Sequence, residues 1–401
     1  MAHSFRLHLG AAACALFLAA CGGSNDDDGI KQPEIPAVSR IDPISSTARG
    51  MESIVFRSGS AYVSLANSAT EGTAVLKATL PLAANSSWTP VALGSCALGP
   101  VGDFIVRSPK LKLVGDSIWL MQPWNDGAKS EEHSTCNMTA QATSFAARDA
   151  GLRACFDYGC STLSMSDLKQ FGTRLYTNAG AGINLFGSND NGASWKVMRG
   201  QFDSMMCTHT AFHIVGDRVL VGGECPLDFA FLEAYQLGAD GVSLASTTKL
   251  AMTIPVLENR NIQFIESLPN SQRVFVGVEG GLLRSEDGGK SFKFVIQEPV
   301  EGNKAYPYIK SIMPLNGSPD TILVGGFDKH NHKPYLAVSR DGGATWSELS
   351  NLLPGFTVPA GSDSLAMVTS LAQDPQGRIL LTLNEREDGQ GRLLQLTLGR
   401  R

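Results

Sequence analysis

The stretch SRDGGATW, residues 339–346, decides the fold of this chain because close copies of it recur. SNDNGASW occupies residues 188–195, and SEDGGKSF occupies residues 285–292. Weaker copies are GADGVSL at 238–244, ARDAGL at 147–152 and ANSSW at 84–88. The copies stand about 50 residues apart, and self-similarity at such a period is typical of a repeat architecture. The sequence therefore predicts one structural unit per copy.

The shared pattern, Ser-x-Asp-x-Gly-x-Ser/Thr-aromatic, predicts a tight hairpin. An aspartate can accept hydrogen bonds from backbone N–H groups two residues further on and so hold a turn. Glycine adopts the positive φ angles that such turns need. A phosphate-binding loop would need a following helix and a Lys-Ser/Thr pair, and a calcium loop would need more carboxylates and a terminal Glu. No helical pattern follows the motif and the further carboxylates of a calcium loop are missing, so we interpret it as a structural turn.

A second pattern runs at the same period. Seven short apolar strands each follow a polar turn: SAYVSL from residue 60, DSIWLM from 116, TRLYTN from 173, DRVLVGG from 217, QRVFVGV from 272, DTILVGG from 320 and GRILLTL from 377. A unit of this length fits one four-stranded blade of a β-propeller. We therefore expect an all-β fold over residues 45–401, a single propeller with seven blades of four-stranded antiparallel sheet. The last blade offers only three strands, and AVSRIDPI near residue 40 is expected to supply the fourth and close the ring.

The hairpin motif resembles the Asp-box, or BNR repeat, of sialidase-like and related propellers. The resemblance implies a hairpin between the third and fourth strands of a blade, at the periphery and away from the central ligand-binding face. It implies a structural role for the aspartate and the aromatic residue of each good copy, which are Asp190, Trp195, Asp287, Phe292, Asp341 and Trp346.

The first 21 residues, MAHSFRLHLGAAACALFLAAC, are typical of an export signal. Arg6 supplies a positive start, and the apolar residues 9–20 are too few to span a bilayer. The run resembles a bacterial lipoprotein signal, which implies that residues 1–20 are removed and that Cys21 carries the lipid. An ordinary secretory signal is the alternative. In the lipoprotein family, Gly22 in place of Asp favours the outer membrane, facing the periplasm or the cell surface.

Residues 21–44 begin polar and acidic, which predicts a flexible tether.

Six further cysteines predict disulfides, because an even number in an exported chain is typical of them. The expected pairs are Cys155–Cys160, which bracket a small loop, Cys207–Cys225 on neighbouring expected strands, and Cys96–Cys136 by elimination. Sequence alone does not choose among the possible pairings. Zinc is the poorer interpretation, because no C-x-x-C pair is present.

Candidate catalytic groups are scattered along the chain. The resemblance to sialidases would imply three arginines around a substrate carboxylate and a Tyr–Glu nucleophile pair. Arginines and tyrosines are available at Arg57, Arg107, Arg260, Tyr306 and Tyr308, but the first expected blade lacks the Arg-Ile/Leu-Pro motif of that family. The spacing does not assemble these residues into a site.

Carboxylates and histidines give equally weak signals. A glycosidase would need two converging carboxylates, and the grouped ones are Glu385, Glu387 and Asp388, with Glu258 and Glu266 elsewhere. Histidines stand at His330 and His332 beside Asp328, and at His209 and His213. A lone H-x-H pair lacks the further ligands of a closed metal site. We therefore expect no metal and no cofactor.

Two functional hypotheses remain. The stretch GGLLRSEDGGKSFKFV, residues 280–295, resembles repeats of photosystem II assembly-factor-like propellers, which implies a non-catalytic platform for protein partners. The first hypothesis is therefore a lipid-anchored platform for an envelope protein complex or transporter. An exo-acting glycoside hydrolase, sialidase-like or glucan-active, is the alternative. The formal net charge of −5 gives no reason to expect a nucleic-acid partner.

Overall fold

The structure, a computed structural model, describes residues 38–68, 70–100, 108–122, 133, 135–156, 159–162, 165–179, 184–199, 208–225, 229–258, 260–298, 300–301, 304–305, 307–328, 333–354, 366–384 and 390–399. These residues form a seven-bladed β-propeller, which confirms the expected fold class. Helical structure in these ranges is limited to two short 3₁₀ turns, η1 (Gly94–Cys96) and η2 (Ser350–Leu352). No described helix is long and apolar enough to span a membrane.

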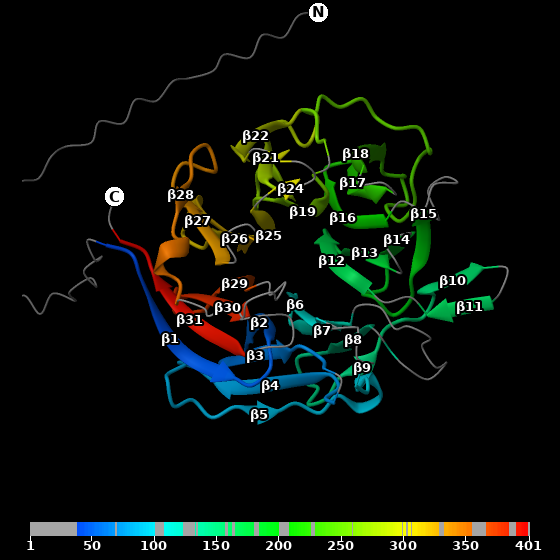
Figure 1. Ribbon diagram of the computed structural model, residues 1–401. Helices are drawn as coiled ribbons and strands as arrows, with labels where there is room; N and C mark the ends of the chain where they lie inside the picture. Colours follow the sequence, from blue (N-terminus) through cyan, green and yellow to red (C-terminus); the bar gives the residue numbers. More distant parts are fainter. Residues whose placement is uncertain are drawn as a thin grey trace, which may run out of the picture.

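Each blade is an antiparallel sheet, and in blades 1 to 6 the strands follow one another in sequence, with the first strand nearest the axis (Figure 1). Blade 1 contains β2 (Met51–Arg57), β3 (Ser60–Leu65), β4 (Ala74–Thr79) and β5 (Thr89–Pro90). Blade 2 contains β6 (Lys110–Val114), β7 (Ser117–Met121), β8 (Thr135–Met138) and β9 (Ala146–Ala147). Blade 3 contains β12 (Met165–Phe171), β13 (Arg174–Ala179), β14 (Asn184–Ser188) and β15 (Lys196–Arg199).

The second half of the ring follows the same plan. Blade 4 contains β16 (Thr208–Val215), β17 (Arg218–Cys225) and β18 (Phe229–Gln236), and a single bridge from Leu237 to Leu244 stands in the fourth position. Blade 5 contains β19 (Ile262–Ser267), β20 (Val274–Val278), β21 (Gly281–Ser285) and β22 (Lys293–Gln297). Blade 6 contains β25 (Tyr308–Leu315), β26 (Ser318–Asp328), β27 (Lys333–Ser339) and β28 (Ser347–Glu348). Two small hairpins, β10 (Arg153–Phe156) with β11 (Gly159–Thr162) and β23 (Val300–Glu301) with β24 (Lys304–Ala305), lie outside the blades.

Blade 7 joins the two ends of the chain. It contains β29 (Met367–Gln373), β30 (Ile379–Asn384), β31 (Gly391–Thr397) and, as its outermost strand, β1 (Arg40–Thr47). Figure 1 shows β1 in blue along the red β31. The amide of Gly399 also donates to Ser39 Oγ over 2.9 Å. The N-terminal strand therefore closes the ring as expected, and the sheet begins at Arg40, ahead of residue 45.

The hairpin at residues 339–346 is held by its serine and its aspartate. Asp341 Oδ1 accepts the amides of Ala344 (3.0 Å) and Thr345 (2.9 Å), and Ser339 Oγ accepts the amide of Gly343 (2.7 Å). Hydrogen bonds, first from the Thr345 hydroxyl and amide, hold the pKa of Asp341 well below its usual range. The hairpin at 285–292 uses the same bonds, and so does the one at 188–195, except that the amide of Ala193 donates to the carbonyl of Asp190.

The same hairpins also fasten neighbouring blades. A glycine in each hairpin packs on a side chain from the second strand of the preceding blade: Gly192 on Trp119, Gly289 on Leu220, and Gly343 on Phe275. The weaker copy at 147–152 is different, because it follows the fourth strand of its blade, β9, and does not connect the third strand to the fourth.

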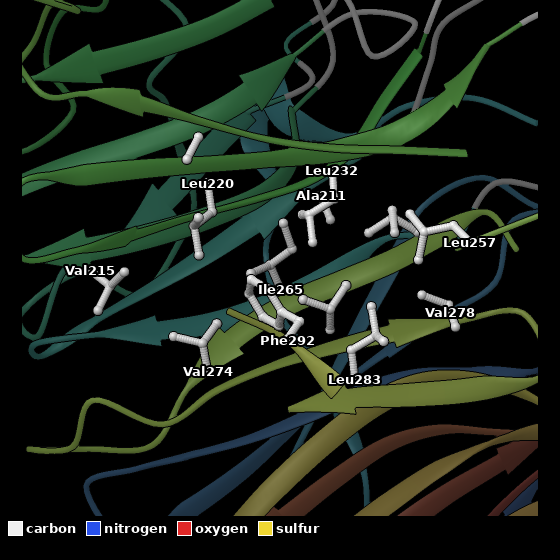
Figure 2. Packing of buried hydrophobic residues seen from close by; sticks show 13 residues of the cluster. Ala211, Val215, Leu220, Leu232, Leu257, Ile265, Val274, Val278, Leu283 and Phe292 are labelled. Atoms are coloured by element: carbon white, nitrogen blue, oxygen red, sulfur yellow. The ribbon is translucent and has the colours of Figure 1, made fainter. Parts of the chain in front are cut away.

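The hydrophobic core is divided among the contacts between blades. Seven buried clusters occur, one between each pair of neighbouring blades. Figure 2 shows the one between blades 4 and 5, where Ala211 and Leu220 face Ile265, Leu283 and Phe292. Each sheet is thus buried on both faces, which explains why the strands of the second pattern are almost wholly apolar.

One disulfide lies within the described part. Cys96 in η1 and Cys136 in β8 are bonded at 2.08 Å, and both are fully buried. Cys155 and Cys160 are opposite one another in the β10–β11 register. Cys21 and Cys207 lie outside the described residues.

Candidate functional site

The propeller axis contains a cavity of about 310 Å³. All seven innermost strands line it. Ligand sites in folded proteins are concave and usually few, so this cavity is the first place to look for function.

β-Bulges shape one end of this cavity. Six of the seven innermost strands skip one residue in their pairing with the second strand, and the skipped residues are Glu52, Ser166, Thr210, Gln263, Lys310 and Thr369. Such bulges redirect a side chain and often occur next to functional sites. Four of the six line the cavity, namely Glu52, Gln263, Lys310 and Thr369. We call this end, at the starts of the innermost strands, the mouth.

A polar network crosses the wall formed by blades 2 to 5. Four residues of the innermost strands lie at one height along the axis: Lys112, Lys169, His213 and Glu266. Each pairs with the equivalent residue of the second strand in its own blade, which is Trp119, Tyr176, Leu220 or Phe275 respectively. At that level, blades 6, 7 and 1 carry Met313, Ala372 and Ile54. The charged side chains of this level therefore lie on one side of the ring, whereas its residues in blades 6, 7 and 1 pack into the clusters between blades.

Lys169 is the centre of the network and is only 4% exposed. Its ammonium lies 2.9 Å from Asp167 Oδ2 and also donates to Glu266 Oε1. Lys112 contacts Asp167 Oδ1 at 3.1 Å from the other side. His213 lies 3.9 Å from Glu266 through Nδ1 and 2.8 Å from Ser267 Oγ through Nε2.

The environment fixes the charge of each group. Burial would raise the pKa of Asp167 and of Glu266, but Lys112 and Lys169 lower both values instead. Burial would lower the pKa of Lys169, and the two carboxylates raise it instead. Burial, with help from Lys169, lowers the pKa of His213 to about 4. At neutral pH, two ammonium groups therefore balance two carboxylates around a neutral imidazole.

This network of ion pairs is better suited to binding a ligand or stabilising the fold than to hydrolysing a glycosidic bond. A glycosidase needs one carboxylic acid that holds a proton near neutral pH, beside a second carboxylate. Asp167 and Glu266 converge on one ammonium, but both are ionised and paired. The network offers no proton donor for a leaving group.

The residues proposed from sequence are not brought together. Arg57 donates to the carbonyl of Thr139 (3.0 Å), and Arg260 donates to those of Gly280 and Glu298 (2.8 Å each). Both guanidinium groups are buried and bonded to the backbone, so they do not form a carboxylate clamp. Tyr308 packs against Phe327 with ring centroids 4.6 Å apart. Arg107, Tyr306, His330, His332, Glu385, Glu387 and Asp388 lie outside the described residues. In the part that the structure describes, no three metal-ligating side chains gather.

Sequence reasoning singled out His213 and Glu266 separately and missed Lys112, Asp167 and Lys169. A usable signal existed, because residues 112, 169 and 213 stand at one common offset before the second residues of their strand motifs, Ser117, Arg174 and Arg218. A charge that recurs at one position of successive blades must converge on the axis, since equivalent positions of the innermost strands face one another there.

Comparison with known proteins agrees on the fold. No family model and no curated protein matches the sequence. Among solved structures, YCF48 from Cyanidioschyzon merolae is similar with a TM-score of 0.50 and 12% identity, over 89% of this chain and 98% of that one. YCF48 bound to D1 peptide is similar with a TM-score of 0.51 and 12% identity, over 92% of this chain and 100% of that one. A chain of the mitotic checkpoint complex is similar with a TM-score of 0.51 and 11% identity, over 96% of this chain and 99% of that one. At these identities the likeness concerns the propeller fold.

Proposed function

We propose that this protein is a lipid-anchored envelope protein that acts as a non-catalytic platform for protein partners, such as an envelope complex or transporter. The observation that carries the proposal is the pairing of Asp167 and Glu266 with Lys169, which removes the two axial carboxylates from acid–base chemistry. The Asp-box-like hairpins support it as well, because the residues that recur in them hold the turns and fasten neighbouring blades.

Similarity to a propeller that binds a peptide points the same way. One similar structure is YCF48 bound to D1 peptide, and the sequence around residues 280–295 resembles assembly-factor propellers of that kind. A platform needs a rigid body with an accessible surface, and the ring of buried interfaces between blades provides the rigidity.

The alternative is an exo-acting glycoside hydrolase. Two observations favour it: burial raises the pKa of Glu279 to about 7, and carboxylates from blades 3 and 5 meet at one cavity. Their lowered pKa values oppose it, because neither group would carry the proton that a departing sugar requires.

Anchoring at Cys21 has a direct test. Cys21→Ser should move the protein from the membrane fraction to the soluble periplasmic fraction or block its processing, because the thioether to lipid cannot form. A single acyl chain binds membranes only weakly, so stable anchoring needs the full lipid group. The measurement is membrane fractionation with immunoblotting, and Cys14→Ser, inside the signal, is the matched control. Equal partitioning of the wild type and a Cys21→Ser protein that has lost residues 1–20 would contradict lipidation at Cys21.

The platform itself requires two measurements on one preparation. Tagged wild-type protein is purified from gently solubilised envelopes and is also assayed on chromogenic glycosides, including sialosides and glucan fragments. We expect a stoichiometric envelope-protein partner and no turnover. Turnover that Asp167→Asn or Glu266→Gln abolishes would replace the platform with the hydrolase, provided that both variants remain folded.

A further inference from the structure

Two ammonium groups lie at the mouth of the axial cavity in addition to those of the network, and one of them, that of Lys110, also helps to lower the pKa of Asp167. Lys110 begins β6 and is exposed, and its ammonium has no ion pair or hydrogen bond within the described part of the chain. Lys310, the bulged residue of β25, is exposed as well and donates to Gln263 Oε1. Both lysines line the cavity.

The opposing charge at the mouth is smaller. Glu52 is buried, and its Oε1 accepts a hydrogen bond from Asn384 Nδ2 at 2.8 Å. Asp167 and Glu266 are already balanced by Lys112 and Lys169. Lys310 also faces Glu279, whose pKa burial raises to about 7, so below that pH two ammonium groups stand against one ionised carboxylate, which favours an anion there.

The wall beyond the mouth is partly apolar. Ile312 and Leu371 line it from blades 6 and 7, and Leu113, 40% exposed, lines it from blade 2. Hydroxyl groups of Ser311 and Ser370 lie next to the bulged residues. A ligand that fits this lining has a charged end and a short apolar part.

We propose that the axial cavity binds a carboxylate carried next to a small apolar group, with the carboxylate at the Lys110–Lys310 mouth and the apolar group inside. The volume of 310 Å³ is at the small end of ligand sites, which span about 300–1,000 Å³. It admits the end of a peptide or a small free acid but no folded domain. The site stands independently of the platform function.

The neighbourhood of Glu279 adds a pH dependence. Gln263 Nε2 lies 3.4 Å from Glu279 Oε1, and Lys310, Tyr308, Asn261 and Glu224 also face this carboxyl group. Burial raises the pKa of Glu279 to about 7. Above that pH the ionised Glu279 opposes an anion at the mouth, so affinity for the carboxylate falls as the pH rises from 6 to 8.

The test uses the full mature chain and a fluorescein-labelled hexapeptide, Gly-Ser-Gly-Ser-Ala-Val, with either a free or an amidated C-terminus. Fluorescence anisotropy should show at least tenfold weaker binding of the amide. The double variant Lys110→Met/Lys310→Met should lose at least tenfold in affinity for the acid. Lys333→Met, which removes another exposed ammonium of blade 6, should bind as the wild type does. Thermal unfolding confirms that each variant is folded.

Further arms identify the source of the carboxylate and the role of Glu279. Competition by 4-methylpentanoate would assign the site to free acids as well as to peptide ends, whereas competition by unlabelled peptide acid alone would assign it to peptide ends. Glu279→Gln should remove the dependence on pH. Equal binding of acid and amide, wild-type affinity in the double variant, or no binding of either probe would overturn the proposal.

Discussion

Gly192→Ala should destabilise the propeller by about 2–5 kcal/mol. Gly192 has a φ of 76°, and an added Cβ would lie 2.2 Å from Trp119 Cη2. A left-handed conformation costs a non-glycine residue about 1–2 kcal/mol, and overpacking a filled site costs about 1–3 kcal/mol more. Trp119 is fully buried and meets Trp195 edge to face at 6.2 Å, so it has no room to withdraw. Urea unfolding followed by tryptophan fluorescence measures the loss.

The matched control lies in the same blade. Gly172 has a φ of 60°, but an added Cβ would meet nothing within 4 Å. Gly172→Ala should therefore cost only the conformational part, about 1–2 kcal/mol. If both variants lose the same stability, the hairpin glycine is required for its backbone angle alone, and its packing between blades contributes nothing.

Lys169→Met should destabilise the protein by about 3–5 kcal/mol, because it leaves two buried carboxylates without their shared partner. The sign of the pH dependence follows from the lowered pKa values of Asp167 and Glu266. Groups with lowered values stabilise the fold above the ordinary carboxyl range and lose that contribution in acid. The difference between wild type and variant should thus be full at pH 7 and shrink as the solution is acidified. Urea unfolding at several pH values gives both results.

An exposed ion pair serves as the control. Lys333 lies 3.0 Å from Glu348, with side chains 42% and 49% exposed, and Lys333→Met should cost about 0–1 kcal/mol. A triple variant, Lys169→Met with Asp167→Asn and Glu266→Gln, should recover much of the loss, since no buried charge then lacks a partner. Similar losses in Lys169→Met and Lys333→Met would mean that the axial network does not bear on stability.

The fold could be predicted because its signals are local. The turn at 339–346 is specified by Ser339, Asp341 and two glycines within a few residues. The strand motifs are apolar on both sides because each sheet is buried between two others. The closure by β1 could also be predicted from the sequence, because the last expected blade offers only three strands and the segment near residue 40 belongs to no other blade.

The site could not be predicted in the same way. Lys112, Lys169 and Glu266 come from three blades, and each alone resembles an ordinary solvated charge in a strand. They form a network only once the closed ring brings them together. The bulges at Gln263 and Lys310, which line the cavity, also cannot be recognised from the types of residue in these strands. Local sequence specifies turns and strands, whereas the chemistry of the axis arises only after closure.

That closure has a consequence for how the molecule comes into being. β1 is the first strand of the propeller to be synthesised and its partner β31 is the last, so β1 cannot pair until β31 has been made. Until then β1 and β30 each present an open edge, which is a template for pairing with other chains. Contacts this distant in sequence also form slowly. Loss of β31, by a ribosome that stalls before residue 391 or by proteolysis, would therefore leave a propeller that cannot close. The unpaired edges of β1 and β30 would then be free to pair with strands of other chains.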